Sequence, residues 1–177
     1  MTIDSSKQYS VVIKTDKGDI RLQLFADQAP RAVNNFVFLA KDGFYDGLTF
    51  YSVLPGFVAQ AGDPTCTESV EVTCTRSGGP GYFLPREGND LQHDAGVVAM
   101  AAPPGGEDIN GSQFYVTYTP QLHLDGRDTV FGKVVEGTDV LESLTSRDAR
   151  DPSAPPGDKI LSVSIEELGG APPPTTE

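Results

Sequence analysis

Few side chains in this sequence of 177 residues could carry a standard catalytic reaction. There are only two histidines, His93 and His123. The sequence contains no Gly-x-Ser-x-Gly turn, no Gly-x-x-x-x-Gly-Lys phosphate loop and no His-Glu-x-x-His zinc motif. Acidic residues are scattered through predicted loops. Hydrolase, kinase and metalloenzyme chemistry therefore has little support, and we expect no cofactor.

Two cysteines, Cys66 and Cys74, are the other reactive side chains. Neither a histidine nor a second cysteine pair lies nearby at ligand spacing, which argues against a metal site. Spacing alone does not fix the separation of the Cβ atoms, so a disulfide and a pair of free thiols both stay open. A disulfide is the expectation if the protein works outside the cytosol.

What remains is a set of apolar and amide side chains on predicted strands and adjoining loops: Phe57, Val58, Gln60, Ala101, Ala102, Gln113, Tyr115, His123 and Leu124. Successive strand residues point to opposite faces, so Gln113 and Tyr115 share one face and Phe114 takes the other. An inward Phe114 is ordinary core, whereas an outward aromatic beside amides resembles a pocket. The residues alone favour core plus unrelated surface over a binding site.

The elements that would position these residues are mostly short strands. Alternation around a Gly-containing turn predicts a β-hairpin over residues 9–27. Further strands are predicted at 48–54, 58–61, 96–102, 112–118, 129–137 and 159–168. Helical spacing predicts a helix from Pro30 to Gly43, and a second, short helix over 138–147 with Thr138 as its cap. This pattern indicates a closed antiparallel barrel capped by helices.

Composition limits the possible partners and the domain count. The net charge is −12, which argues against nucleic acid and anionic membranes, although plain solubility explains it as well. No apolar stretch approaches the length of a membrane span, and the first ten residues lack the features of a signal peptide. We expect a flexible segment at 1–8, one domain at 9–168 and a disordered Pro-rich tail at 169–177.

Seven stretches in order along the chain resemble the cyclophilins, the peptidyl-prolyl cis–trans isomerases, and above all the compact bacterial ones. They read GDIRLQLFADQAPRAVNNFVFLA, GFYDGLTF, VLPGFVAQAGDP, GGPGY, HDAGVVAMA, NGSQFYVTYTPQLHLDGRDTVFGKVVEG and GDKILSVSIEEL. The resemblance implies an all-β-dominated fold, namely an eight-stranded antiparallel barrel capped by two α-helices. It also implies a groove for proline-containing peptides or unfolded segments on the outer face.

Carried over residue by residue, the resemblance assigns roles along this groove. Phe57, Val58, Tyr115 and Leu124 match the pocket that holds the proline ring, and His123 takes a position often held by tryptophan. Gln60 and Gln113 match two groove amides. Ala101 and Ala102 match the segment that pairs with the peptide backbone, and Asp128 takes a position where histidine is common.

The main departure from the family is Ser52, which stands where the family has its catalytic arginine. The family motif is Phe-His-Arg before a Pro-Gly turn, whereas this sequence reads Phe-Tyr-Ser. In the family the guanidinium donates to the proline carbonyl and to its ring nitrogen, and the second bond forms only once the amide twists. Serine is too short for this, so we expect weak activity. Arg127, or Arg76 and Arg86 beside the insertion, could supply a replacement cation.

A second departure is an insertion at about 65–77, between GDPT and GGPGY, where compact relatives have about four residues. It is either a tolerated surface insertion or a device that alters partner choice.

Three hypotheses follow: a slow prolyl isomerase that assists protein folding, a non-catalytic module that binds proline peptides, and a groove filled by the chain's own Pro-rich tail. We expect a monomer, cytoplasmic as the sequence stands, and extracytoplasmic if a leader was removed and Cys66–Cys74 is oxidised.

Overall fold

The computed structural model describes residues 3–67 and 74–169. The tail predicted at 169–177 lies outside this range except for Gly169. The described elements, in chain order, are β1 (Gln8–Thr15), β2 (Gly18–Leu24), α1 (Pro30–Lys41), β3 (Ser52–Val53), β4 (Val58–Ala61), β5 (Phe83–Leu84), β6 (Val97–Met100), β7 (Ile109–Asn110), β8 (Phe114–Thr117), the 3₁₀ helix η1 (Leu122–Leu124), β9 (Thr129–Glu136), α2 (Thr138–Ser143) and β10 (Ile160–Leu168).

Eight of these strands form one curled antiparallel sheet in the order β10-β1-β2-β9-β6-β8-β4-β3. Residues outside the strands pair with each of its two ends. The Ile160 amide at the start of β10 donates to the Leu48 carbonyl at 2.8 Å, and Val53 in β3 exchanges two bonds of 2.8 Å with Arg147. These bonds cover part of the two outer strands, β10 and β3. The predicted eight-stranded barrel with two α-helices is confirmed.

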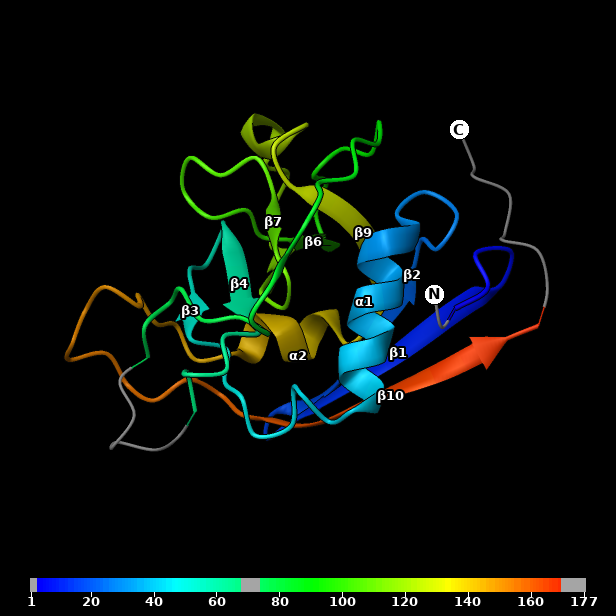
Figure 1. The fold of residues 1–177 in the computed structure, drawn as a ribbon. Helices are drawn as coiled ribbons and strands as arrows, with labels where there is room; N and C mark the ends of the chain where they lie inside the picture. The colour runs from blue at the N-terminus through cyan, green and yellow to red at the C-terminus, as the bar shows by residue number, and fades with distance from the viewer. Residues whose placement is uncertain (1–2, 68–73, 170–177) are drawn as a thin grey trace.

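Helix α1 packs against β9 and β10 and supplies much of the interior core (Figure 1). Its apolar residues recur every three to four positions, so they form one face that is buried against the sheet. The ring of Phe36 lies 4.9 Å from that of Tyr45 and 5.4 Å from that of Phe114 on β8. Edge and offset contacts of this kind add to the energy of burial. They anchor β8, the strand that carries much of the site.

The sheet presents a different apolar cluster on each face. Phe114 belongs to the interior cluster under α1. Tyr115, one residue on, belongs to a second cluster with Val58 and Ala99 on the outer face, against which Phe57 and Leu124 pack. Because side chains alternate along a strand, Phe114 belongs to the core and the next residue, Tyr115, belongs to the outer face.

Several boundaries differ from the sequence prediction. The strand predicted at 48–54 is reduced to β3, because residues 48–50 pair in isolated bridges and single bonds with residues 66–67 and 158–160 instead of with a neighbouring strand. The N-cap of α2 is Gly137, not Thr138. Its φ of 85° is left-handed, and a Cβ there would lie 2.3 Å from the Asp19 carbonyl oxygen, so only glycine fits. Strands β5 and β7, which pair with each other, were not predicted.

The segment predicted to be flexible at 1–8 makes contacts with the domain from residue 3 onward. The amide of Ile3 donates to Asn34 at 3.3 Å, and the amide of Asp4 donates to the Tyr9 hydroxyl at 2.8 Å. Within the two described ranges, no helix has the length and apolar character needed to cross a lipid bilayer.

Candidate active site

A cavity of about 490 Å³ opens on the outer face of the sheet, and we call it the groove. Strands β4 and β8 form its floor, and loops from three distant parts of the chain form its walls. It is lined by Tyr51, Ser52, Leu54, Phe57, Val58, Gln60, Arg76, Ser77, Phe83, Ala101, Ala102, Pro103, Pro104, Asn110, Gln113, Tyr115, Leu124, Asp128, Asp148, Ala149 and Arg150. Every predicted site residue except His123 is in this set.

One end of the groove is apolar and is formed by Phe57, Val58, Tyr115 and Leu124. Val58 and Tyr115 are buried on adjacent strands, while Phe57 and Leu124 are partly exposed. His123 does not line the groove. Its ring stacks on that of Phe57, with centroids 5.9 Å apart and planes 18° apart, so it covers the outer side of this wall. A pocket with this lining suits a small apolar ring.

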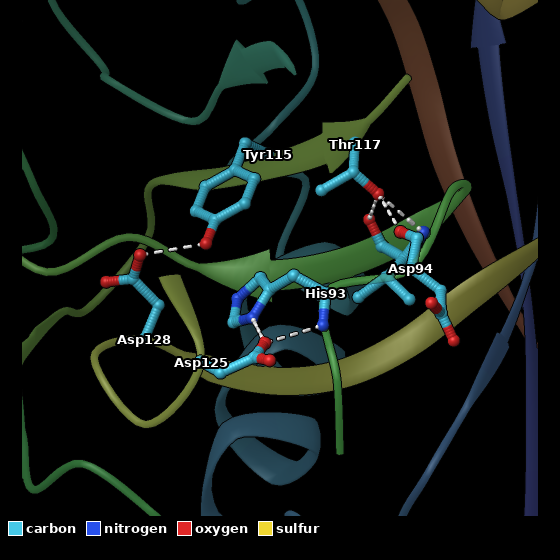
Figure 2. A network of polar contacts seen from close by, with 7 residues as sticks. His93, Asp94, Tyr115, Thr117, Asp125 and Asp128 are labelled. Carbon is cyan, nitrogen blue, oxygen red and sulfur yellow. Dashed lines mark hydrogen bonds and ion pairs between the residues drawn. The ribbon is translucent and has the colours of Figure 1, made fainter. Parts of the chain in front are cut away.

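The hydroxyl of Tyr115 is fixed by Asp128, as Figure 2 shows. It donates to the Asp128 carboxylate at 2.8 Å, and the second carboxylate oxygen accepts the Ala102 amide at 2.8 Å. Burial raises the pKa of Tyr115 far above its ordinary value, and the negative charge of Asp128 raises it further. Tyr115 is therefore a neutral wall of the pocket. Asp128 ties β8 to the 101–102 segment.

His93 supports the same wall from below. Its ring stacks against that of Tyr115, with centroids 6.1 Å apart (Figure 2). The Asp125 carboxylate accepts both the His93 amide and its Nδ1, each at 2.8 Å, and these bonds lower the pKa of Asp125. The His93 side chain is fully buried, and the structure describes no partner for its Nε2. The role of this histidine is to hold Tyr115 and the 122–125 turn in place.

The two predicted groove amides are bonded to each other. Gln60 Nε2 donates to Gln113 Oε1 at 3.0 Å, and the Tyr51 hydroxyl donates to the same oxygen at 2.6 Å. Gln113 Nε2 in turn donates to the carbonyls of Gly78 at 2.8 Å and Arg76 at 3.3 Å. Gln113 is thus satisfied by protein groups on both its oxygen and its nitrogen. It positions the 76–78 loop, and Gln60 is the amide with capacity left for a ligand.

Ser52 lines the groove. It is paired with Gln60 across β3 and β4, and Gln60 is paired with Tyr115 across β4 and β8. Its short side chain leaves space beside Gln60 where a longer one would project into the groove.

Two arginines line the groove, and they are Arg76 and Arg150. Arg127 and Arg86, both predicted as possible replacement cations, are not among the lining residues. Arg86 donates instead to the Arg127 carbonyl at 3.1 Å, which holds both near the 3₁₀ turn. Arg150 is paired with Asp148 through bonds of 3.0 and 2.8 Å, and this lowers the pKa of Asp148 to about 2.

Cys66 and Cys74 form a disulfide at the base of the insertion. Cys66 is buried, and its carbonyl accepts the amide of Thr49 at 2.9 Å and the hydroxyl of Thr49 at 3.0 Å. The disulfide therefore connects the segment that leads into Arg76 and Ser77 on the groove wall to Cys66, which is bonded to the barrel. Residues 68–73 between the cysteines lie outside the described range.

Removing this disulfide is expected to destabilise the fold. Closing a loop between cysteines eight residues apart restricts the unfolded chain, and the double variant Cys66→Ala/Cys74→Ala should lose about 2–3 kcal/mol of unfolding free energy. Urea unfolding of the oxidised wild type and of the variant measures this loss of unfolding free energy. Wild-type protein in a reducing agent serves as the control and should match the variant. Equal midpoints for the oxidised wild type and the variant would contradict the assignment.

The buried tyrosines predict how stability responds to alkaline pH. Burial raises the pKa values of Tyr45, Tyr51 and Tyr115 above the ordinary value of 10.0. Because the folded-state pKa is the higher one, their contribution is complete below pH 10 and is lost as the pH rises above it. Each should reduce the unfolding free energy by about 1.4 kcal/mol per pH unit in that range.

Urea unfolding between pH 8 and 11 tests this expectation. Tyr51→Phe should remove one such contribution from the slope, since phenylalanine does not titrate. An unchanged slope in that variant would show that Tyr51 ionises normally in the folded protein.

Sequence reasoning alone misses part of the groove. The loop 148–150 reaches the rim because Arg147 is bonded to the Tyr51 carbonyl at 2.8 Å and to the Pro155 carbonyl at 2.7 Å. These long-range bonds have no local signature in the sequence. Tyr51 was identified only as a departure from the family motif. Its bond to Gln113 gives it a positioning role.

A second, smaller cavity of about 160 Å³ lies near α2, lined by Ala95, Gly96, Thr117, Tyr118, Val134, Thr138, Leu141 and Glu142. It has no residue in common with the groove. It is the natural comparison site for any binding experiment.

Comparison with known proteins agrees with this geometry. The profile of the family "Cyclophilin type peptidyl-prolyl cis-trans isomerase/CLD" matches residues 10–165. A peptidyl-prolyl cis–trans isomerase of Synechococcus elongatus is 46% identical over 87% of this chain and 94% of its own length. Peptidyl-prolyl cis–trans isomerase B of Bacillus subtilis is 44% identical, over 75% and 87% respectively.

A solved cyclophilin-type isomerase of Cryptosporidium parvum superposes with a TM-score of 0.77 at 31% identity, covering 90% of this chain and 98% of that one. A second structure of that protein, determined in the presence of the dipeptide Ala-Pro, gives a TM-score of 0.76 at 32% identity, covering 89% and 98%. The residues matched by the family profile, 10–165, include all of those that line the groove. The chain therefore belongs to the cyclophilin-type peptidyl-prolyl cis–trans isomerase family.

Proposed function

We propose that this protein catalyses the cis–trans isomerisation of X–Pro bonds in peptides and unfolded segments, slowly and without a cofactor, and so assists protein folding. The observation that carries the proposal is the apolar end of the groove, where Phe57, Val58, Tyr115 and Leu124 surround a space beside Gln60. A proline ring fits this chemistry. The structure of a relative determined with Ala-Pro supports the same substrate class.

The barrier that must be lowered is about 18–20 kcal/mol, because resonance stiffens the C–N bond. A twisted amide is less polar than a planar one, since conjugation is broken. An apolar pocket that excludes water therefore favours the twisted form over the planar one. Gln60 can hold the flanking peptide in place, so that rotation is confined to one bond, the C–N bond before the proline.

Ser52 is the reason to expect a low rate. A hydrogen-bond donor that acts only in the transition state typically contributes about 10²–10³ in rate. The serine hydroxyl is too short to reach a bound amide across the groove without a bridging water. The apolar pocket and Gln60 are then the remaining sources of acceleration.

Ser52 also favours a second function, that of a module which binds proline segments without turning them over. Binding requires only the apolar end and the groove walls, and all of these are in place. The two functions predict different behaviour for the same peptide.

NMR exchange spectroscopy on a short Ala-Pro peptide separates the two functions. With catalytic amounts of protein, a slow isomerase should give cis–trans exchange cross-peaks above the uncatalysed rate, which is on the order of one event in tens to hundreds of seconds. A binding module should shift the peptide resonances and leave the exchange rate at background. Background exchange with clear binding would overturn the enzymatic proposal.

A further inference from the structure

The guanidinium of Arg76 is an exposed cation on the wall of the groove. Within residues 3–67 and 74–169, its side chain makes neither a hydrogen bond nor an ion pair. The positive charge of Arg76 nevertheless acts on two other residues that line the groove, Tyr51 and Asp148. Burial raises the pKa of Tyr51, and the positive charge of Arg76 opposes that rise. Hydrogen bonds from Arg150 lower the pKa of Asp148, and the charge of Arg76 adds to that lowering.

The backbone that carries this cation is held on both sides. Arg76 has a φ of 61°, the one left-handed non-glycine conformation among the described residues, and such a conformation persists only where surrounding contacts enforce it. On one side, Cys74 is in the disulfide and the Thr75 amide donates to Thr65 Oγ1 at 2.9 Å. On the other, the Gly78 amide donates to Asp63 at 2.9 Å. The Arg76 carbonyl itself accepts from Gln113.

Of the other charged residues that line the groove, Arg150 and Asp148 form an ion pair, and Asp128 accepts hydrogen bonds from neutral groups. Arg150 is bonded to Asp148 through two nitrogen–oxygen contacts. The Asp128 carboxylate accepts from Tyr115 and from the Ala102 amide. Among the described cations that line the groove, Arg76 is therefore the one without an ion pair, and a ligand carboxylate can neutralise its charge.

The position of Arg76 relative to the apolar end follows from β8. Gln113 and Tyr115 lie on one face of this strand, two residues apart, which is about 7 Å. Tyr115 forms the pocket, and Gln113 bonds the Arg76 carbonyl. An extended peptide advances at most about 3.3–3.6 Å per residue. With a proline ring against Tyr115, Arg76 faces the residue one or two positions away.

From these observations we propose that Arg76 is a specificity-determining residue that makes the groove prefer proline segments with an acidic side chain one or two residues from the proline. This inference rests on the proposed function, because it takes the apolar end as the proline pocket. A guanidinium pairs with a carboxylate through two parallel hydrogen bonds. The preference is local, since the net charge of −12 repels acidic peptides at longer range.

The test compares peptides that differ only beside the proline: Ala, Glu or Lys at each of the two positions on either side. Exchange rates and binding are measured by NMR at about 0.15 M salt for the wild type, Arg76→Ala and Arg76→Glu. Arg31→Ala is the matched control, because Arg31 is an exposed arginine on α1 outside the groove.

We expect the wild type to favour Glu over Ala by about threefold to fivefold at one of these positions, the range of a partly exposed ion pair. Arg76→Ala should abolish that preference, and Arg76→Glu should shift the Glu-to-Lys ratio by more than about tenfold toward Lys. Raising the salt to 1 M should weaken the wild-type preference. Arg31→Ala should keep it.

The failures of the two proposals are distinguishable. If no peptide is bound or isomerised, the proposed function fails. If the Ala peptide is bound or isomerised but Glu, Ala and Lys behave alike, or if Glu is disfavoured at every position, the assignment of Arg76 is overturned and the proline groove stands.

Discussion

Replacing Ser52 with arginine is expected to raise kcat/KM for a proline peptide by about 10²–10³-fold. The substitution places a guanidinium beside Gln60, its partner across β3 and β4. From there the planar fork can donate to the proline carbonyl and, once the amide twists, to the ring nitrogen. The second bond exists only near the transition state, so the gain should appear mainly in kcat. The protease-coupled isomerisation assay measures it.

Ser52→Lys is the control that separates charge from geometry. Lysine brings a compact point charge without the bidentate fork, so its gain should be smaller than that of arginine. If Ser52→Arg leaves the rate unchanged while the wild type already turns over at a high rate, another group performs this role. The account of Ser52 would then be wrong.

The second large effect is expected from Phe57→Ala. This ring forms one wall of the apolar end and is partly exposed in the free protein, so a bound proline would cover it. An apolar side chain of this size contributes about 1.5–3 kcal/mol when it is fully buried. The loss of its contact with the proline should lower kcat/KM about 10- to 100-fold, with a parallel loss in peptide affinity.

Phe38→Ala is the matched control. Phe38 lies on α1, is 50% exposed and does not line the groove. Its removal should leave both kcat/KM and affinity close to those of the wild type. Urea unfolding of both variants checks that neither effect arises from loss of structure. Equal activities for Phe57→Ala and the wild type would place the proline elsewhere.

Much of the fold could be predicted from the sequence because its strands alternate and its main helix is amphipathic. The hairpin of β1 and β2 and the helix α1 follow directly from these local periods. Strands β5 and β7 could not be predicted. Each has two residues, and they pair with each other across a separation in sequence that no local pattern reveals.

The candidate site also has a part that could be predicted from the sequence and a part that could not. The alternation on β8 separates Phe114 from Tyr115, and the family motifs identify the rest of the apolar end. The internal bonding of Gln113 was not predictable, because its partners include backbone carbonyls of the 76–78 loop. From the sequence, Arg76 was considered only as a possible replacement cation beside the insertion. Its place on the groove wall depends on the disulfide and on a left-handed backbone.

The central claim is that proline peptides bind in the groove on the outer face of the barrel. It is tested most directly by titrating ¹⁵N-labelled protein with an Ala-Pro peptide and following the backbone amides. Binding in the groove predicts shifts concentrated at residues 57–60, 101–102 and 113–115, with little change at Thr138 and Leu141 beside the smaller cavity. Shifts concentrated at that smaller cavity, with the groove amides unmoved, would contradict it.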